Sequence, residues 1–558
     1  MEKIWLKNYP KGVPAEINID DYASLAELFN ESCERYASSS AYISMGQSLS
    51  YAQLHEAARR FAAWLQEQGA TRGTRVALMM PNILQYPVAL FGTLLAGCTV
   101  VNCNPLYTAR ELEHQLKDAQ AEFVVVVENF AHTLEVARPA LPDLKHVVVT
   151  TLGDMLGTLK GLLLNLIVRH VKKMVPAWSL PGHIRFADIM KRTNVDDFRP
   201  VSLDHSDMAF LQYTGGTTGV AKGAVLSHGN LVANLCQAYA WVKPYAKGNN
   251  NDFVVTALPL YHIFALTANC LTFIRLGATN LLILNPRDIP GFIKELRKYP
   301  FTAFTGVNTL FNALLNNADF KSVSFEHLKL TLGGGMAVQR PVAERWKQVT
   351  GRPLTQAYGL TETSPAVTIN PLDLKEFNGS IGLPVPSTDI SIRDDQGKEL
   401  AVNETGELCV KGPQVMRQYW NKEAETQKAF EPDGFLRTGD MGYINEDGYI
   451  FLVDRKKELI IVSGFNVYPS EIEEVVASHP GVSEVAAIGA ENGASGEVVK
   501  IVVVRKDASL TEKALIDFCR TELTGYKVPK IVEFRDELPK SAVGKILKRE
   551  LKQAPEKG

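Results

Sequence analysis

A run of glycine, threonine and lysine near the middle of the chain has the composition of a phosphate-binding loop. It extends from Tyr213 to Gly223, reads YTGGTTGVAKG and follows the apolar run 208–211. Four glycines allow tight backbone turns that direct N–H groups into a concave nest, and three hydroxyls and one ammonium add further anion-binding groups. The run is not a Walker A loop, because Lys222 is followed by Gly223 and not by serine or threonine. This composition favours an anion site over a plain connection between strands.

Four more short motifs follow in the chain, at 356–362 (QAYGLTE), 436–440 (LRTGD), 454–457 (DRKK) and 539–545 (PKSAVGK). With the glycine-rich run, they resemble the ordered motifs of the adenylate-forming superfamily, which includes acyl-CoA synthetases, luciferases and the adenylation domains of peptide synthetases. The resemblance covers nearly the whole chain. Three segments are similar to the branch of bacterial long-chain fatty acid–CoA ligases, namely 258–264, 433–440 and 462–469.

The resemblance implies a two-step reaction. ATP would activate a long-chain fatty acid as an acyl-adenylate, and CoA would then take the acyl group as a thioester, with release of AMP and pyrophosphate. The first step brings two anions together, whose repulsion at ~4 Å and an effective dielectric near 20 is about 4 kcal/mol. Bound Mg²⁺ and fixed cations must offset that repulsion.

The resemblance also implies which residues would bind ATP and magnesium. Lys545 would bridge the acyl oxygen and the α-phosphate, while Glu362 and the Thr214 hydroxyl would supply the hard oxygen ligands that Mg²⁺ prefers. Asp440 would accept both ribose hydroxyls, and Tyr358 would stack on adenine. The remaining implied ATP-binding residues are Gly215, Gly216, Thr217, Thr218, Gly219, Lys222, Gly334, Gln356, Ala357, Thr361 and Arg455.

The second step would use different residues. In this family the small C-terminal domain rotates between the two steps, and Lys457 is the implied pivot. Ser463 and Gly464 would line the path of the pantetheine arm, where glycine allows close approach. The residues implied next to the acyl carboxylate are His262, Gly334 and Gly335.

Taken without the resemblance, these residues have plainer explanations. Lys545 is then an exposed lysine in a basic tail, and Glu362 an exposed acid in a turn. Asp440 would form an Asx turn after a glycine. Tyr358 and His262 would be core side chains.

The elements that must position these motifs alternate between helix and strand. We predict helices over 52–68 and 111–119 and strands over 75–79, 122–127, 253–258 and 281–284. Because the strands are continuously apolar, they indicate parallel sheets covered by helices on both faces. The fold class is therefore α/β.

The chain changes character after residue 375. Short strands and turns at 394–397 and 445–448 predict a small β-rich, barrel-like unit. An α+β tail follows, with strands over 483–488, 498–504 and 531–534 and with capping boxes at Ser470/Glu473 and Ser509/Glu512. We predict an N-terminal AMP-binding domain over 1–453 that holds the ATP and fatty acid sites, a hinge over 454–457, and a mobile domain over 458–558 that carries the adenylation lysine.

Charge and cysteine content restrict the class of protein. The 558 residues include 59 basic and 61 acidic side chains, a formal charge of −2, so the basic excess of a general nucleic-acid binder is absent. Seven scattered cysteines without a C-x-x-C motif indicate packed thiols in a reducing compartment, and they offer no clustered zinc ligands. We expect a cytoplasmic protein without a signal sequence.

One segment has the composition of a membrane-surface helix. Residues 155–178 combine many leucines with basic side chains, end in Trp178 and contain no acidic residue. Such a helix suits the inner face of a membrane, although a packed covering helix explains the same pattern. No apolar run is long enough for a transmembrane helix.

Three alternatives remain open at this stage. The acid could be medium-chain or aromatic, or the acceptor an acyl-carrier protein in place of CoA. A protein that keeps the fold could also bind acyl chains without catalysis. The sequence leaves both a monomer and a homodimer open.

Overall fold

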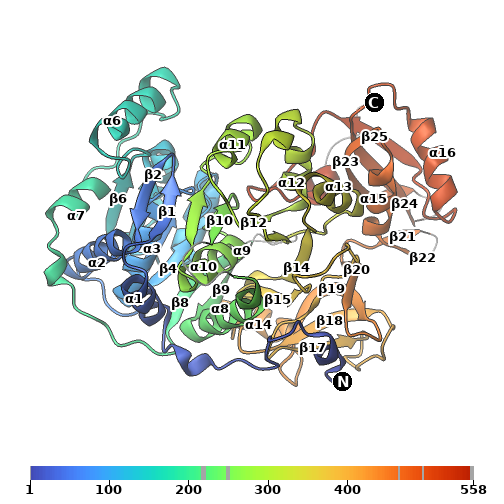
Figure 1. The fold of residues 1–558 in the computed structure, drawn as a ribbon, viewed down its shortest axis with the longest axis horizontal. Coiled ribbons are helices and arrows are strands. Elements are labelled where there is room, and N and C mark those ends of the chain that lie inside the picture. The colour runs from blue at the N-terminus through green and yellow to red at the C-terminus, as the bar shows by residue number, and fades with distance from the viewer. Residues whose placement is uncertain (1, 215–220, 247–251, 463–464, 493–495, 553–558) are drawn as a thin grey trace.

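The computed structural model describes residues 2–214, 221–246, 252–462, 465–492 and 496–552. Two large sheets lie beside each other, a smaller sheet adjoins them, and the C-terminal α+β tail lies at the far end from α6 (Figure 1). The helices along the chain are α1 (Leu25–Arg35), α2 (Tyr51–Glu67), α3 (Gln85–Leu95), α4 (Ala109–Asp118), α5 (Ala131–Ala137), α6 (Thr158–Leu166), α7 (Phe186–Arg192), α8 (His228–Val242), α9 (Ile263–Ala265), α10 (Thr272–Arg275), α11 (Ile289–Leu296), α12 (Asn308–Leu315), α13 (Arg340–Thr350), α14 (Glu423–Ala429), α15 (Pro469–Ser478), α16 (Glu512–Glu522) and α17 (Lys548–Lys552).

The first large sheet has seven strands in the order β7-β6-β5-β3-β4-β8-β9. All neighbours are parallel except β8 and β9, which form an antiparallel pair. This pair leads the chain into and out of the glycine-rich run. The strands are β3 (Arg75–Met79), β4 (Thr99–Asn102), β5 (Phe123–Val127), β6 (His146–Thr150), β7 (Ile184–Arg185), β8 (Met208–Thr214) and β9 (Lys222–Ser227).

The second large sheet has nine strands in the order β16-β15-β14-β13-β12-β10-β11-β1-β2. Its centre is parallel and both edges are antiparallel. The strands are β1 (Ser40–Ser44), β2 (Gln47–Ser50), β10 (Phe253–Thr256), β11 (Thr279–Leu282), β12 (Ala303–Gly306), β13 (Leu330–Gly333), β14 (Thr355–Gly359), β15 (Ala366–Ile369) and β16 (Leu383–Pro384).

The predicted α/β class with parallel sheets is confirmed. The strand predicted over 75–79 is β3, and the helix predicted over 52–68 is α2, shifted by one residue. The strand β5 is buried along its whole length, which explains why its apolar run shows no alternation. The strands near 253 and 281 are shorter or displaced by two residues, because each apolar run continues into a buried loop.

The predicted β-rich unit is a four-stranded antiparallel sheet in the order β17-β18-β19-β20. Both predicted turns are present, and Gly397 and Gly448 adopt positive φ there, at 77° and 81°. Asp454 and Arg455, the first two residues of the predicted hinge, are the last residues of β20. The strands are β17 (Asp389–Arg393), β18 (Gly406–Lys411), β19 (Leu436–Ile444) and β20 (Ile450–Arg455).

The C-terminal tail forms a five-stranded sheet with α15 and α16. Its buried apolar clusters, which comprise residues between 460 and 551, are separate from the clusters that precede them. The strands are β21 (Ile460–Val462), β22 (Phe465–Val467), β23 (Val482–Asn492), β24 (Gly496–Arg505) and β25 (Ile531–Arg535).

Both predicted capping boxes are wrong. At α15, Ser470 does not cap its own helix; its N–H and hydroxyl donate to the Asp454 carboxylate, at 2.8 and 3.0 Å. At α16, the helix begins at Glu512, and Thr511 is the cap. The four-residue pattern is a local property of the sequence, whereas in the structure a distant carboxylate at α15 and a later hydroxyl at α16 accept from the free N–H groups.

The predicted surface helix is shorter than expected. It comprises α6 and a π-helical turn at Ile167–Val171, and residues after 171 leave the helix. One face is anchored: Gly161 packs against Gly153, and the Asn165 amide donates to Thr151 Oγ1 at 2.8 Å. The opposite face is solvent-exposed and apolar. The exposed large side chains of this segment are Leu159, Leu162, Leu163, Leu166, Val171 and Met174.

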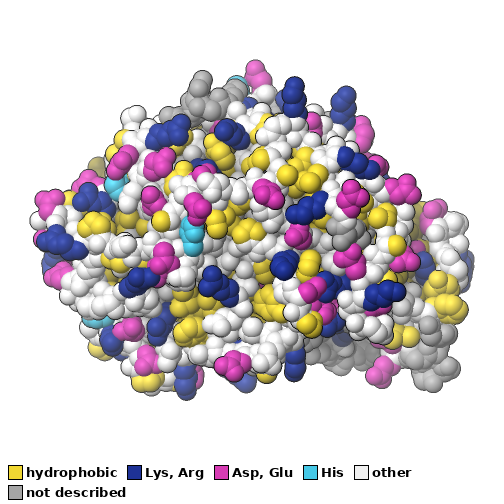
Figure 2. All heavy atoms as spheres, turned by 90° about the horizontal axis from the view of Figure 1, so that it is seen from below, with side chains coloured by type: hydrophobic (Ala, Val, Ile, Leu, Met, Phe, Trp, Pro, Cys, Tyr) yellow, Lys and Arg dark blue, Asp and Glu magenta, His cyan; other side chains and the backbone are white. Residues whose placement is uncertain are grey.

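The surface and the thiols agree with the composition. On the face drawn in Figure 2, basic and acidic side chains are interspersed. All seven cysteines are buried and free, as predicted. Among the described residues, no helix is both long enough and apolar enough to cross a bilayer.

Candidate active site

The strands β8 and β9 present the ends of the glycine-rich run. Thr214 is the last residue of β8 and lies opposite Lys222, the first residue of β9. The ammonium of Lys222 lies 5.1 Å from the centroid of the Tyr419 ring. The predicted residues Gly215, Gly216, Thr217, Thr218 and Gly219 lie outside the described residues.

Three predicted nucleotide-binding side chains meet at the edge between the second large sheet and the four-stranded sheet. Tyr358 from β14 donates its hydroxyl to Asp440 Oδ2 at 2.6 Å, and Arg455 Nε lies 3.3 Å from Asp440 Oδ1. Asp440 and Arg455 are cross-strand partners in β19 and β20. Burial, followed by the negative charge of Asp440, raises the pKa of the Tyr358 hydroxyl well above its usual range. The arrangement offers an aromatic face, a carboxylate and a guanidinium within one small area.

Gln356 serves the fold through its side chain. Its Oε1 accepts a hydrogen bond from the Val338 N–H at 2.8 Å, and its Nε2 donates to the Ser380 carbonyl at 3.3 Å. The residue is buried. Its amide therefore orders the loop after β13, while Ala357 continues the strand toward Tyr358.

The turn after β14 carries Thr361 and Glu362. The Glu362 carboxylate accepts a hydrogen bond from the Tyr419 hydroxyl at 2.6 Å, and its backbone carbonyl accepts one from Met416 N at 2.8 Å. Burial and the Glu362 charge raise the pKa of the Tyr419 hydroxyl, so it remains a donor at neutral pH. The turn also contacts β8 and β9, which brings Glu362 to the same side as Thr214 and Lys222.

Lys545 enters this region from the C-terminal tail. The plainer explanation required an exposed lysine, but Lys545 is partly buried. Burial and the nearby positive charge of Arg455 lower the pKa of its ammonium to about 8. The carboxylates of Glu458 and Asp440 act in the opposite direction. Lys545, Arg455 and Asp440 therefore form one group of interacting charges drawn from both parts of the chain.

The residues predicted next to the acyl carboxylate also come together. His262 Nδ1 accepts a hydrogen bond from the Phe264 N–H at 3.3 Å and so caps the short helix α9. Burial, with a smaller effect of Lys545, lowers the pKa of His262 to about 4, so the ring is neutral at pH 7. A Cβ at Gly334 would lie 3.2 Å from both the Ala357 carbonyl and the Phe264 ring. Only glycine fits there without displacing one of them.

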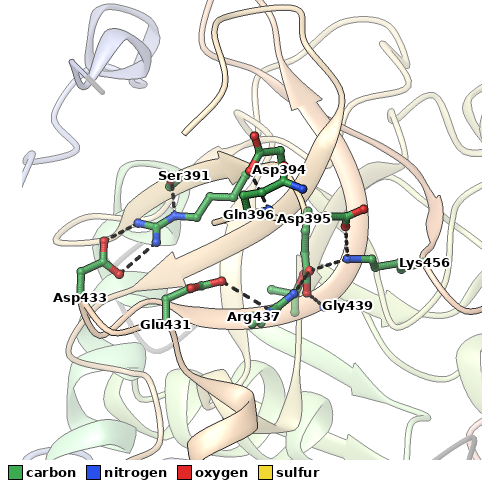
Figure 3. A network of polar contacts seen from close by, with 12 residues as sticks. Ser391, Asp394, Asp395, Gln396, Glu431, Asp433, Arg437, Gly439 and Lys456 are labelled. Carbon is green, nitrogen blue, oxygen red and sulfur yellow. Dashed lines mark hydrogen bonds and ion pairs between the residues drawn. The ribbon is translucent and has the colours of Figure 1, made fainter. Parts of the chain in front are cut away.

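The segment around Lys457 connects the four-stranded sheet to the tail. In the polar network of Figure 3, the ammonium of Lys456 lies 2.7 Å from Asp395 Oδ1 and 3.4 Å from Glu407 Oε2. On the other side, the Glu458 carboxylate faces Lys548 of α17 at 3.6 Å. Lys457 therefore lies between one residue held by the four-stranded sheet and one that faces the tail. The predicted CoA residues Ser463 and Gly464 lie outside the described residues.

Two family matches cover this architecture. Residues 29–420 match the family described as AMP-binding enzyme, and residues 471–545 match the AMP-binding enzyme C-terminal domain. The chain belongs to the AMP-binding enzyme family. The predicted membership in the adenylate-forming superfamily is thereby confirmed.

Curated relatives of this AMP-binding enzyme align over its whole length. It is 57% identical over 555 residues to a long-chain-fatty-acid–CoA ligase of Escherichia coli O157:H7, covering 99% of this chain and 98% of that protein. A ligase of the same name from Haemophilus influenzae is 51% identical over 554 residues, with the same coverage.

Solved structures share the fold of this AMP-binding enzyme. ATP-bound MatB from Rhodopseudomonas palustris has a TM-score of 0.79 at 28% identity, covering 95% of this chain and 98% of that one. The o-succinylbenzoate CoA synthetase of Bacillus subtilis in complex with ATP and magnesium ion has a TM-score of 0.75 at 26% identity, covering 94% and 99%.

Tyr419 is the site residue that sequence reasoning missed in this AMP-binding enzyme. It contacts the predicted metal ligand Glu362 through its hydroxyl and faces Lys222 with its ring. No local pattern marks it, because Tyr419 is 57 residues from Glu362 and 197 from Lys222 in sequence. The only signal available was the aromatic pair Tyr419-Trp420 in an otherwise polar stretch.

Proposed function

We propose that this AMP-binding enzyme is a long-chain fatty acid–CoA ligase. It activates the fatty acid with ATP as an acyl-adenylate and then forms the CoA thioester, with release of AMP and pyrophosphate. The observation that carries the proposal is the partly buried Lys545, whose charge interacts with those of Asp440 and Arg455, because it supplies a cation where two anions must meet. The full-length similarity to curated ligases of that name supports the substrate class.

The residues of the nucleotide site divide the binding of ATP among them. Tyr358 stacks on adenine, and Asp440 accepts the ribose hydroxyls, with Arg455 Nε 3.3 Å from its carboxylate. Thr214 and Lys222, with the run 215–219 between them, hold the phosphates. Lys545 then neutralises charge between the acyl oxygen and the α-phosphate as the new bond forms.

Magnesium fits the oxygen ligands of this site. The described residues contain no group of three or more His, Cys, Asp or Glu side chains arranged for a metal ion. Mg²⁺ usually takes only one or two carboxylates and fills its other positions with phosphate oxygens and water. Glu362 and the Thr214 hydroxyl meet that need. Bound Mg²⁺ would offset the charge of the phosphates and of the departing pyrophosphate.

We assign the ATP and fatty acid sites to residues 1–453, the hinge to 454–457 and a mobile domain to 458–558. His262, Gly334 and Gly335 lie along the acyl carboxylate. Rotation at Lys457 withdraws Lys545 after the first step and opens the path of the CoA thiol. Ser463 and Gly464 line that path.

An assay of AMP release across a panel of acids, with and without CoA, tests the substrate assignment. We expect the largest kcat/KM with long-chain fatty acids and a requirement for CoA for turnover. Aromatic and medium-chain acids are the matched alternatives, and an acyl-carrier protein replaces CoA in a parallel arm. Fatty acid binding without any AMP release contradicts the proposal, and a preference for an aromatic acid reassigns the substrate.

We further propose that the enzyme is cytoplasmic and that the surface of α6 and the following turn binds the inner face of an anionic membrane. Four of its leucines, at 159, 162, 163 and 166, are exposed, with Leu159 at 85% exposure, although apolar helical faces usually point into the core. Basic side chains flank this face at Lys160, Lys172 and Lys173. Arg169 pairs with the buried Glu128 and so fixes the helix in this orientation.

Flotation with liposomes tests this surface. We expect wild type to float with anionic vesicles and to lose that association in Leu159→Ser/Leu163→Ser, because both leucines would leave the bilayer interface. Lys172→Glu/Lys173→Glu should lose binding to anionic vesicles through charge repulsion. Val136→Ser is the control, since Val136 is an exposed apolar side chain on α5. Equal flotation of wild type and the three variants would exclude this surface as the membrane-binding site.

A further inference from the structure

Two side chains of α12 contact the C-terminal domain next to the adenylation lysine. The Thr309 hydroxyl donates to the Gly544 carbonyl at 2.9 Å, and the Asn312 amide donates to the Ser483 carbonyl at 3.0 Å. Residues 309 and 312 are three positions apart, so they share one face of the helix. Helix α12 belongs to the second large sheet's layer and follows β12, so it is part of the body that holds ATP.

The first contact lies directly before Lys545. Gly544 has a φ of +82°, and a Cβ there would lie 3.0 Å from Thr309 Oγ1 and 3.3 Å from Val307 Cγ2. The loop therefore approaches α12 as closely as a glycine backbone allows. Because Gly544 and Lys545 are adjacent, a hydrogen bond to the Gly544 carbonyl restricts the position of the Lys545 Cα, from which the side chain extends.

The loop that carries Lys545 is held within itself as well. Ser541 N donates to the Lys545 carbonyl at 2.8 Å, Gly544 N donates to the Ser541 carbonyl at 2.9 Å, and Lys545 N donates to Ser541 Oγ at 3.2 Å. A loop closed in this way moves as a unit. Anchoring it at Gly544 therefore positions the lysine, whereas the internal bonds alone do not fix it relative to ATP.

The second contact is linked to the same loop through β23. Asn312 binds the carbonyl of Ser483 in β23, and the next residue, Glu484, pairs with Lys540 at 2.7 Å. Lys540 lies at the base of the lysine loop, where it bridges to Ile546. Asn312 is buried and Ser483 is half-buried, so this contact is partly shielded from water.

We propose that Thr309 and Asn312 are positioning residues that stabilise the arrangement in which Lys545 reaches the α-phosphate. Both act through backbone carbonyls of the C-terminal domain and touch neither substrate. Rotation of that domain breaks both hydrogen bonds, so they favour the adenylation step over the thioester step. This inference rests on the role proposed for Lys545.

The test measures the two half-reactions separately in the full-length enzyme. Adenylation is followed as acyl-dependent pyrophosphate exchange, and thiolysis as CoA ester formed from supplied acyl-adenylate. Thr309→Val keeps the side-chain shape but removes the donor. Losing one hydrogen bond should lower adenylation by roughly five- to tenfold and leave thiolysis unchanged or faster.

Thr309→Ser is the matched control, because it restores the hydroxyl and should restore adenylation. Asn312→Leu repeats the test at the second contact, and it decides the matter if thermal unfolding shows that Thr309→Val is poorly folded. A wholly structural role would lower both half-reactions together. That result, or unchanged adenylation in folded Thr309→Val and Asn312→Leu, overturns the proposal.

Lys545→Ala is measured in the same assays. If it loses adenylation while the Thr309 and Asn312 variants do not, only the positioning role proposed for Thr309 and Asn312 fails. If Lys545→Ala retains adenylation, the proposed role of the lysine fails and the positioning role fails with it.

Discussion

Replacing Lys545 with alanine should lower the rate of acyl-adenylate formation by about 10³ and leave thiolysis of supplied acyl-adenylate largely intact. An ammonium ~4 Å from a developing negative charge, at an effective dielectric near 20, contributes about 4 kcal/mol, and each 1.36 kcal/mol is tenfold in rate. The Lys545 ammonium interacts electrostatically with the charges of Arg455, Asp440 and Glu458. Single-turnover measurement of each half-reaction checks the expectation. An equal loss in both would show that Lys545 has no specific role in the first step.

The titration of Lys545 supplies a second measurement for the same residue. Its pKa is lowered to about 8, so the ammonium is present below that pH and is lost above it. The kcat/KM of adenylation for ATP, which reports the free enzyme, should therefore fall above pH ~8 and not near pH ~10.4, the ordinary lysine range. In Lys545→Arg that basic limb should disappear, even though the rate is lower, because guanidinium remains charged. A wild-type profile that stays flat up to pH ~10 would contradict the assignment.

Replacing Lys457 with proline should impair thioester formation and largely spare adenylation. Proline fixes φ at about −65° and lacks an N–H. In the observed arrangement Lys457 does not have a positive φ, and among the described residues no partner accepts its N–H, so proline meets no obvious obstacle there. A backbone conformation incompatible with proline costs of order 3 kcal/mol, which corresponds to roughly 10² in the rate of a step that requires rotation.

Lys457→Ala is the matched control for this prediction. It removes the side chain but leaves φ free, so both half-reactions should stay near wild type. The contacts of Lys456 with Asp395 and Glu407 keep the preceding residue on the four-stranded sheet in either variant. Wild-type output of CoA ester by Lys457→Pro would exclude a pivot at this position.

Much of the site could be predicted because its residues lie in short motifs at strand ends. The resemblance of these motifs implied one nucleotide site for Tyr358, which lies in β14, and for Thr214, at the end of β8, although the two strands belong to different sheets. Asp440 and Arg455 are neighbours in the ladder of β19 and β20. The predicted roles of these residues remain proposals, and their placement together is what the tertiary structure adds.

Other features could not be predicted, because they depend on contacts between distant segments. The Tyr419 hydroxyl reaches Glu362, and the Asp454 carboxylate replaces the expected cap of Ser470. Gln356, which is predicted to bind ATP, also orders the loop after β13 with its side chain. In each case the local sequence is compatible with several partners, and only packing selects one.

The amino-acid sequence by itself determined the family, the α/β class and the motifs that carry the chemistry, since apolar strand runs and glycine-rich turns are local properties. Only the tertiary structure decided that Lys545 is partly buried near Asp440 and Arg455, that four leucines of α6 face outward, and that α12 contacts the lysine loop. The reason is physical. Burial, charge pairing and docking between domains depend on contacts between distant segments, and a local stretch of sequence does not specify its distant partners.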